Sequence, residues 1–126
     1  MRFEGIHRVA RSEASEQMEV VLRLKQKRIL FCAIPNDSSD MRDPRLRAQR
    51  MKMGVLAGAP DLLIFDAPPP YLGIALEMKR ANGTFKDLRE NQEAVLDSLV
   101  ERGWAKVVGF GAQDAFTKLR AIGLDV

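Results

Sequence analysis

The stretch PDLLIFDAPPPYLGIALEMK, residues 60–79, decides the fold of this 126-residue chain. It contains two apolar runs of strand length, PDLLIFD (60–66) and LGIALEMK (72–79), joined by the short link APPPY. Two strands separated by so few residues predict an antiparallel hairpin. If the turn is centred near Pro69, residues whose numbers sum to about 138 to 140 lie opposite one another.

This hairpin is expected to gather charged side chains on one face. Successive side chains of a strand point to opposite faces, so Glu77 and Lys79 share a face while Met78 points the other way. The register sets Asp61 against Glu77 or Lys79 and therefore on the same face. A slip of one residue would send Asp61 to the opposite face, so the shared face is a prediction that depends on the register.

The charged face has the composition of a metal site. Two carboxylates that converge in a largely apolar sheet repel each other unless a positive charge lies between them. Oxygen ligands from Asp61 and Glu77, with the backbone carbonyl of Met78, suit Mg²⁺ or Mn²⁺, which keep several waters and bind phosphate oxygens. Lys79 can polarise an attacking water, which favours phosphodiester hydrolysis. The alternative is an exposed hairpin end where Lys79 forms a surface ion pair worth less than about 1 kcal/mol.

Two further polar residues are expected near this face. Apolar residues at helical spacing predict the longest helix of the chain over residues 85–101, and Gln92 interrupts its apolar stripe. A polar residue there needs a hydrogen-bond partner, and the helix would lay its stripe across the sheet, so Gln92 is expected to reach the site. Glu13, in the first turn of an earlier helix, could add a carboxylate. A first-turn acid is equally well explained by the helix dipole.

The remaining segments predict helices around a mixed sheet. Helices are expected over residues 13 to about 27 with Ser12 as N-cap, from Pro44 to near Gly54 with Asp43 as N-cap, and over 112–124, and further strands over 29–35 and 104–111. The strand–helix–strand unit near the C-terminus implies a right-handed crossover, which lays the fourth strand parallel to the third. The fold class is therefore α/β, with a mixed sheet of about four strands flanked by helices.

Composition indicates one folded domain over residues 1–126, because 46% of the residues are hydrophobic, 29% are charged and no internal repeat is present. The single cysteine, Cys32, lies in an apolar run and is expected to be a buried small hydrophobe rather than a nucleophile. No apolar run approaches the ~20 residues that span a bilayer, and the N-terminus lacks a secretory signal pattern. We therefore expect a cytoplasmic protein without a membrane segment.

The net charge of +3 is distributed unevenly. A basic tail occupies residues 1–11, and the segment RDPRLRAQRMK carries a second cluster of cations, namely Arg42, Arg45, Arg47, Arg50 and Lys52. Such clusters favour a polyanionic partner through counterion release, so these five residues are candidates for phosphate contacts with such a partner. A solvated helix face and a frayed tail explain the charge equally well.

These motifs together are similar to a known family. PDLLIF followed by ALEMK resembles the PD-(D/E)xK nuclease signature. The blocks SEASEQ, AIPN, MKMGVLAGAPDLLIF, GIALEMKR and NQEAVLDSLVERGW follow in order over about residues 12 to 110, and they resemble the VRR-NUC group of small phage, bacterial and eukaryotic nuclease domains. One departure is the alanine of GAPD, where the family usually has valine.

The resemblance implies a restriction-endonuclease-like core and assigns roles within it. It makes Asp61 and Glu77 the metal-binding carboxylates, Lys79 the catalytic lysine and Gln92 a supporting glutamine. It also implies a first-helix glutamate, for which Glu13 matches better than the substitute Glu16.

Stand-alone members of the group resemble structure-selective nucleases that act as homodimers on four-way (Holliday) DNA junctions. The resemblance therefore implies a Mg²⁺- or Mn²⁺-dependent DNA endonuclease. A homodimer would present two sites to a nearly two-fold symmetric junction. The alternatives are a flap or nicking nuclease of the same fold and a non-catalytic DNA-binding module.

Overall fold

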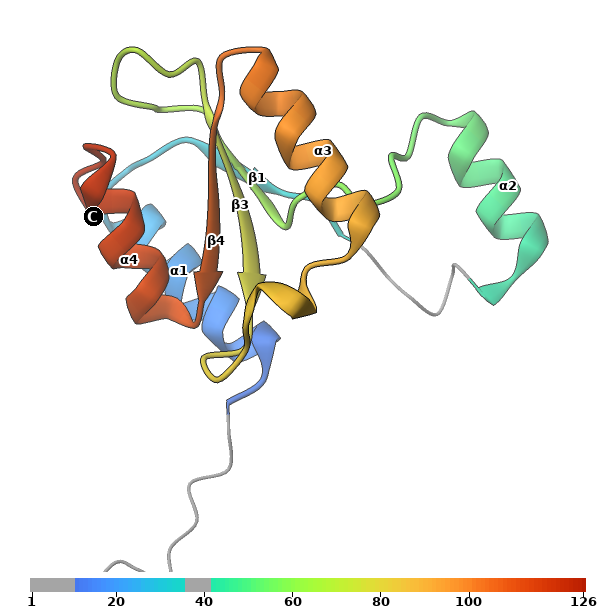
Figure 1. Ribbon diagram of the computed structural model, residues 1–126, viewed down its shortest axis with the longest axis horizontal. Coiled ribbons are helices and arrows are strands. Elements are labelled where there is room, and N and C mark those ends of the chain that lie inside the picture. The colour runs from blue at the N-terminus through green and yellow to red at the C-terminus, as the bar shows by residue number, and fades with distance from the viewer. Residues whose placement is uncertain (1–10, 36–41) are drawn as a thin grey trace, which may run out of the picture.

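The computed structural model describes residues 11–35 and 42–126 (Figure 1). The strands are β1 (Phe31–Ala33), β2 (Leu62–Ile64), β3 (Ile74–Lys79) and β4 (Ala105–Phe110). The helices are α1 (Glu13–Gln26), α2 (Pro44–Lys52), the 3₁₀ helix η2 (Phe85–Asp87), α3 (Glu90–Glu101) and α4 (Ala112–Ala121). The basic tail predicted for residues 1–11 lies outside the described residues except for Arg11.

The four strands form one mixed sheet in the order β1-β2-β3-β4. The pairs β1/β2 and β2/β3 are antiparallel, and β3/β4 is parallel. In the hairpin, Leu62 pairs with Leu76 and Ile64 with Ile74, so the numbers of opposite residues sum to 138. The predicted hairpin, its register and the parallel crossover are confirmed.

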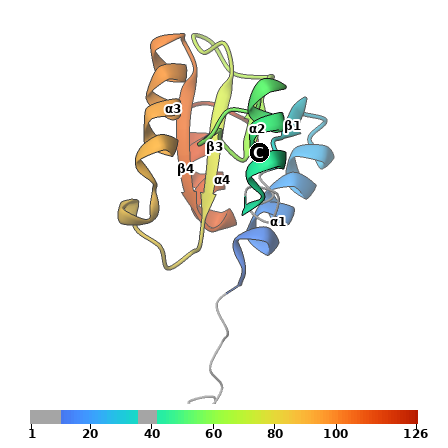
Figure 2. The same cartoon turned by 90° about the vertical axis from the view of Figure 1, so that its right-hand side faces the viewer.

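Alternate residues of β3 belong to different layers, as the two-residue period of a strand requires. Met78 and its even-numbered neighbours pack against α1 and α4 in the main core, which includes Val20, Leu24, Phe116 and Leu119. Ala75 packs instead with Leu96 of α3. Figure 2 shows α3 on one side of the strands and α1 on the other. Every residue of β3 is buried, so the odd-numbered charged residues lie beneath α3.

Two helix starts follow their predicted caps. The side chain of Ser12 accepts the N–H of Ser15 at the start of α1, and that of Asp43 accepts the N–H of Arg45 at the start of α2. Although α2 is well capped, it stands apart from the sheet and the other helices (Figure 1), and none of its nine residues is buried. Its formation therefore depends on local signals rather than on packing.

The helix predicted over residues 85–101 is wrong in its first turn. Thr84 caps the short η2, the backbone is extended at Leu88 and Arg89, and α3 begins only at Glu90. Phe85 is 66% exposed and packs edge-to-face on Phe110, with ring centroids 5.0 Å apart, instead of facing the sheet. The resulting α3 has 12 residues and is shorter than α1, which has 14.

The predicted burial of Cys32 is also wrong. Its strand extends over only three residues of the predicted 29–35, lies at an edge of the sheet, and leaves Cys32 exposed. The reason is that α3 packs over β3 and β4, so this face of β1 has less cover.

In the ranges that the structure describes, no helix is both long and apolar enough to cross a bilayer.

Candidate active site

The hairpin brings three charged residues together at one end of the sheet. Glu77 and Lys79 lie on the α3 face of β3, on either side of Met78, whose side chain is in the main core. Asp61 directly precedes β2, so the register continues to it opposite Glu77. The Oδ2 atom of Asp61 accepts the backbone N–H of Met78 at 2.7 Å, which fixes its carboxylate beside Glu77.

Gln92, in the first turn of α3, connects these residues. Its Oε1 accepts a hydrogen bond from Lys79 Nζ at 3.0 Å and another from the backbone N–H of Arg89 at 2.9 Å. Its Nε2 donates to Glu77 Oε1 at 3.5 Å, and Lys79 Nζ lies 4.0 Å from the same oxygen. Gln92, the polar residue within the apolar stripe of the helix, therefore has hydrogen-bond partners on β3. Its side-chain amide holds the ammonium group of Lys79 in place.

Glu77 is the electrostatically unusual group of the site. It is 2% exposed, and its Oε2 atom has no hydrogen-bond partner among the described residues. Burial raises the pKa of Glu77 to about 9, and the neighbouring Asp61 carboxyl adds to this shift, whereas Lys79 opposes it. When both carboxylates are ionised, neither can donate to the other. A shared proton or a bound cation would satisfy Oε2.

The pair of carboxylates fits a cation that needs few protein ligands. No three His, Cys, Asp or Glu side chains of the described ranges come close enough together to hold a metal ion. Mg²⁺ and Mn²⁺ tolerate such a small set, because they retain several waters and bind substrate phosphate oxygens. Asp61, Glu77 with its unsatisfied Oε2, and the adjacent Met78 carbonyl are the groups that would hold such an ion.

The two candidate glutamates of α1 lie in different environments. Glu13 is exposed and lines the same pocket as Asp61 and Glu77, and its charge contributes to the raised pKa of Glu77. Glu16 is buried, its Oε2 accepts the backbone N–H of Ala112 at the start of α4, and its Oε1 lies 3.4 Å from Arg11 Nη1. Glu13 thus borders the site, whereas Glu16 joins α1 to α4.

The site opens into a pocket of about 630 Å³. Its walls include the linker before β2 and the loop between β3 and α3, which contributes Arg80 and Arg89. The linker approaches α3 closely at Gly58, where φ is +83° and a Cβ atom would lie 2.6 Å from the carbonyl oxygen of Asn91. Only glycine permits this contact, which holds the linker against the turn that carries Gln92.

Comparison with known proteins gives the fold. No family profile matches the chain, and no curated protein matches it in sequence. A solved structure described as "VRR_NUC domain protein" superposes with a TM-score of 0.74 at 21% sequence identity, over 92% of this chain and 91% of that one. The chain has the VRR_NUC fold. The fold class predicted from the sequence is therefore confirmed, and at this identity the likeness concerns the fold alone.

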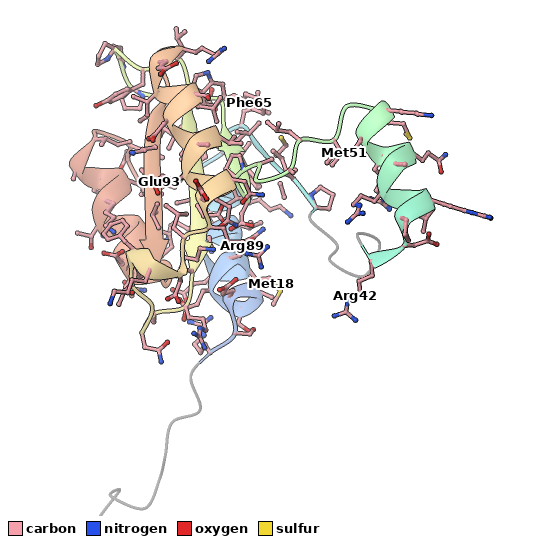
Figure 3. The ribbon with its side chains drawn as sticks, turned by 45° about the vertical axis from the view of Figure 1, so that its right-hand side comes forward. Met18, Arg42, Met51, Phe65, Arg89 and Glu93 are labelled. Carbon is pink, nitrogen blue, oxygen red and sulfur yellow. The ribbon has the colours of Figure 1, made fainter. Side chains whose placement is uncertain are left out.

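Within the VRR_NUC fold, the predicted DNA-contacting cations divide into two groups. Arg50 lines the site pocket. The others are exposed in and just before α2, which stands to the right of the other helices and strands in Figure 3, namely Arg42, Arg45, Arg47 and Lys52. Sequence reasoning did not single out Gly58, Arg80 or Arg89, although Arg80 follows the lysine of the motif directly and Arg89 lies one helical turn before Gln92.

Proposed function

We propose that this chain is a metal-dependent DNA endonuclease that hydrolyses phosphodiester bonds. The observation that carries the proposal is the buried Glu77, whose unsatisfied Oε2 lies in a site shared with Asp61 and Lys79. A carboxylate pair next to a fixed lysine in an arginine-lined pocket suits the binding of a divalent metal and a phosphodiester. The VRR_NUC fold and the PD-(D/E)xK pattern of the sequence give further support.

Each residue has a distinct part in this chemistry. Asp61 and Glu77 would hold Mg²⁺ or Mn²⁺, with the Met78 carbonyl alongside, and such an ion would supply Lewis-acid activation of a water and of a phosphate oxygen. Lys79 orients the attacking water and offsets the charge of the scissile phosphate. Gln92 keeps the ammonium group in place through its 3.0 Å hydrogen bond. Glu13, at the edge of the pocket, supplies a further carboxylate.

The substrate in this proposal is branched DNA, with the four-way junction cut by a homodimer. A two-fold dimer presents two pockets to two strands of the junction. The cations in and before α2 contact phosphates and position the DNA without reading its sequence. A flap or nicking nuclease is the alternative enzyme. The exposed cations in and before α2 would also serve a second candidate, a non-catalytic DNA-binding module.

A cleavage assay tests the proposal. Labelled junction, flap, duplex and single-stranded DNA are incubated with Mg²⁺, Mn²⁺ or EDTA. Asp61→Ala, Glu77→Ala and Lys79→Ala should each lower cleavage by about 100-fold or more while DNA binding is retained. Lys25→Ala, at an exposed position in the last turn of α1, is the charge-matched control for Lys79→Ala and should cut normally.

Two outcomes would overturn the nuclease assignment. Cutting in EDTA, or full activity after loss of either carboxylate, would show that the site does not use a metal held by this pair. A wild-type protein that binds these DNAs but cuts none of them with either metal would instead establish the binding module.

A further inference from the structure

Two arginines of the site pocket form no ion pair with another described residue, although the pocket also contains the carboxyl groups of Asp61, Glu77 and Asp87. Arg80 and Arg89 both line the pocket and are exposed, and in residues 11–35 and 42–126 neither guanidinium has an ion pair or hydrogen bond. Asp87 lies nearby, but its Oδ2 accepts the N–H of Thr84 in the cap of η2. By contrast, Arg23 stacks over Phe116, 4.5 Å from the ring centroid, in the core layer.

The loop that carries these arginines is anchored at both ends. The carbonyl of Arg80 accepts the N–H of Gly83 at 2.9 Å, and the N–H of Arg89 donates to Gln92 Oε1. Between them, Phe85 packs on Phe110, whose ring centroid also lies 4.8 Å from Lys118 Nζ. Because the backbone is fixed, binding an anion would order only the two side chains, which lowers the entropic cost.

Both arginines are also connected to the catalytic groups. Arg80 follows Lys79 in the chain, and Arg89 shares its acceptor, Gln92 Oε1, with the ammonium group of Lys79. Because both arginines line the pocket that also contains Lys79, an anion held by their guanidiniums would lie in the same pocket as Lys79.

The acidic residues of α3 limit the path that a bound polyanion can take over the surface. The exposed face of α3 carries four acidic residues at positions that share one side of a helix, namely Glu90, Glu93, Asp97 and Glu101. Asp97 forms an ion pair with Lys106 at 2.6 Å, so the negative charge of this face comes mainly from the three glutamates. Figure 3 shows Arg89 where α3 begins, Glu93 further along the same helix, and Arg42 at the start of α2. A phosphate backbone is repelled along α3 but attracted on both sides of the pocket.

We propose that Arg80 and Arg89 form a phosphate clamp, so that the DNA backbone crosses the pocket from α2 to the β3–α3 loop instead of running along α3. The clamp rests on the proposed nuclease function for its substrate. A guanidinium presents two parallel donors to phosphate oxygens, which holds a phosphate in a defined orientation. The two arginines would hold phosphates next to the scissile one and set its position relative to Lys79.

The test measures DNA binding in EDTA, where no cleavage occurs. Fluorescence anisotropy of labelled junction and linear duplex is recorded at several KCl concentrations for the wild type, Arg80→Gln, Arg89→Gln and the double variant. Each single substitution should weaken binding to both DNAs and lower the slope of log K against log salt by about 1, and the double variant by about 2. Lys25→Gln, which removes the same charge from the far end of α1, should leave the slope unchanged.

The outcomes separate the clamp from the nuclease activity. A double variant with the wild-type slope overturns the clamp, even if the wild type cuts DNA. A reduced slope in the double variant supports the clamp, even if the wild type cuts nothing, in which case the nuclease proposal alone fails. A wild type without measurable affinity for either DNA overturns the clamp.

Discussion

At the scale of single residues, Glu77 shows what a strand pattern can predict. The two-residue period and the register together put Asp61, Glu77 and Lys79 at one end of the hairpin, and both follow from the sequence. The burial of Glu77 and its unsatisfied Oε2 do not follow from it, because they depend on how α3 covers this end of the sheet.

This burial predicts a pH dependence of stability for the metal-free protein. Between about 4.5 and about 9, the folded protein keeps the Glu77 proton, whereas the unfolded chain has lost it. The folded state then binds more protons, so the free energy of unfolding should fall as pH rises through this window. Glu77→Gln should remove this contribution and raise the melting temperature at the alkaline end, which thermal unfolding in EDTA would measure.

Mg²⁺ provides the complementary measurement. A cation that binds the ionised pair should raise the melting temperature of the wild type most at the alkaline end of the window, and should have little effect on Glu77→Gln. Melting curves that respond identically to pH in the two proteins would contradict the buried-carboxyl explanation.

At the scale of elements, the sequence predicts helix starts correctly where a capping side chain determines them. Ser12 and Asp43 cap helices as predicted. The spacing of apolar residues does not predict the break before α3. There the side chains of Thr84 and Gln92 accept backbone N–H groups, and such side-chain bonds compete with a continuous helix. Cys32 was misjudged because an apolar run does not reveal that its strand lies at an edge.

Helix position alone does not distinguish Glu13 from Glu16, since both lie in the first turn of α1, and only the family resemblance favoured Glu13. Their contacts predict different phenotypes. Glu16→Ala should lower the free energy of unfolding by about 1–3 kcal/mol, because the N–H of Ala112 loses its buried acceptor. Glu13→Ala should leave stability nearly unchanged and reduce cleavage. Thermal unfolding and the cleavage assay, run on both variants, measure this contrast.

A reversed result, with a destabilised Glu13→Ala and an inactive but stable Glu16→Ala, would make Glu16 the glutamate of the site. Glu16→Gln is a useful companion, since its side-chain carbonyl can still accept the N–H of Ala112. It should recover part of the lost stability.

At the scale of the whole molecule, the proposed cleavage of a junction requires two copies of the chain. Large apolar side chains exposed on α1 (Met18 and Leu22) and on and after α2 (Met51 and Met53) are candidates for contacts in the proposed dimer. A single pocket can act on one strand at a time. Paired incision of a junction therefore needs a second copy.

We expect light scattering at micromolar concentration to give twice the 14.1 kDa mass of the chain. A subunit-mixing experiment then connects mass to mechanism. Excess Asp61→Ala protein, allowed to exchange with the wild type, should convert paired incision of a junction into single nicks, because most active subunits would have an inactive partner. If the chain acts as independent monomers, the inactive protein would only compete for junctions. The ratio of paired incisions to nicks would then stay close to the ratio measured with wild-type protein at a lower concentration. A chain that remains monomeric and still cuts two strands symmetrically would contradict the dimer.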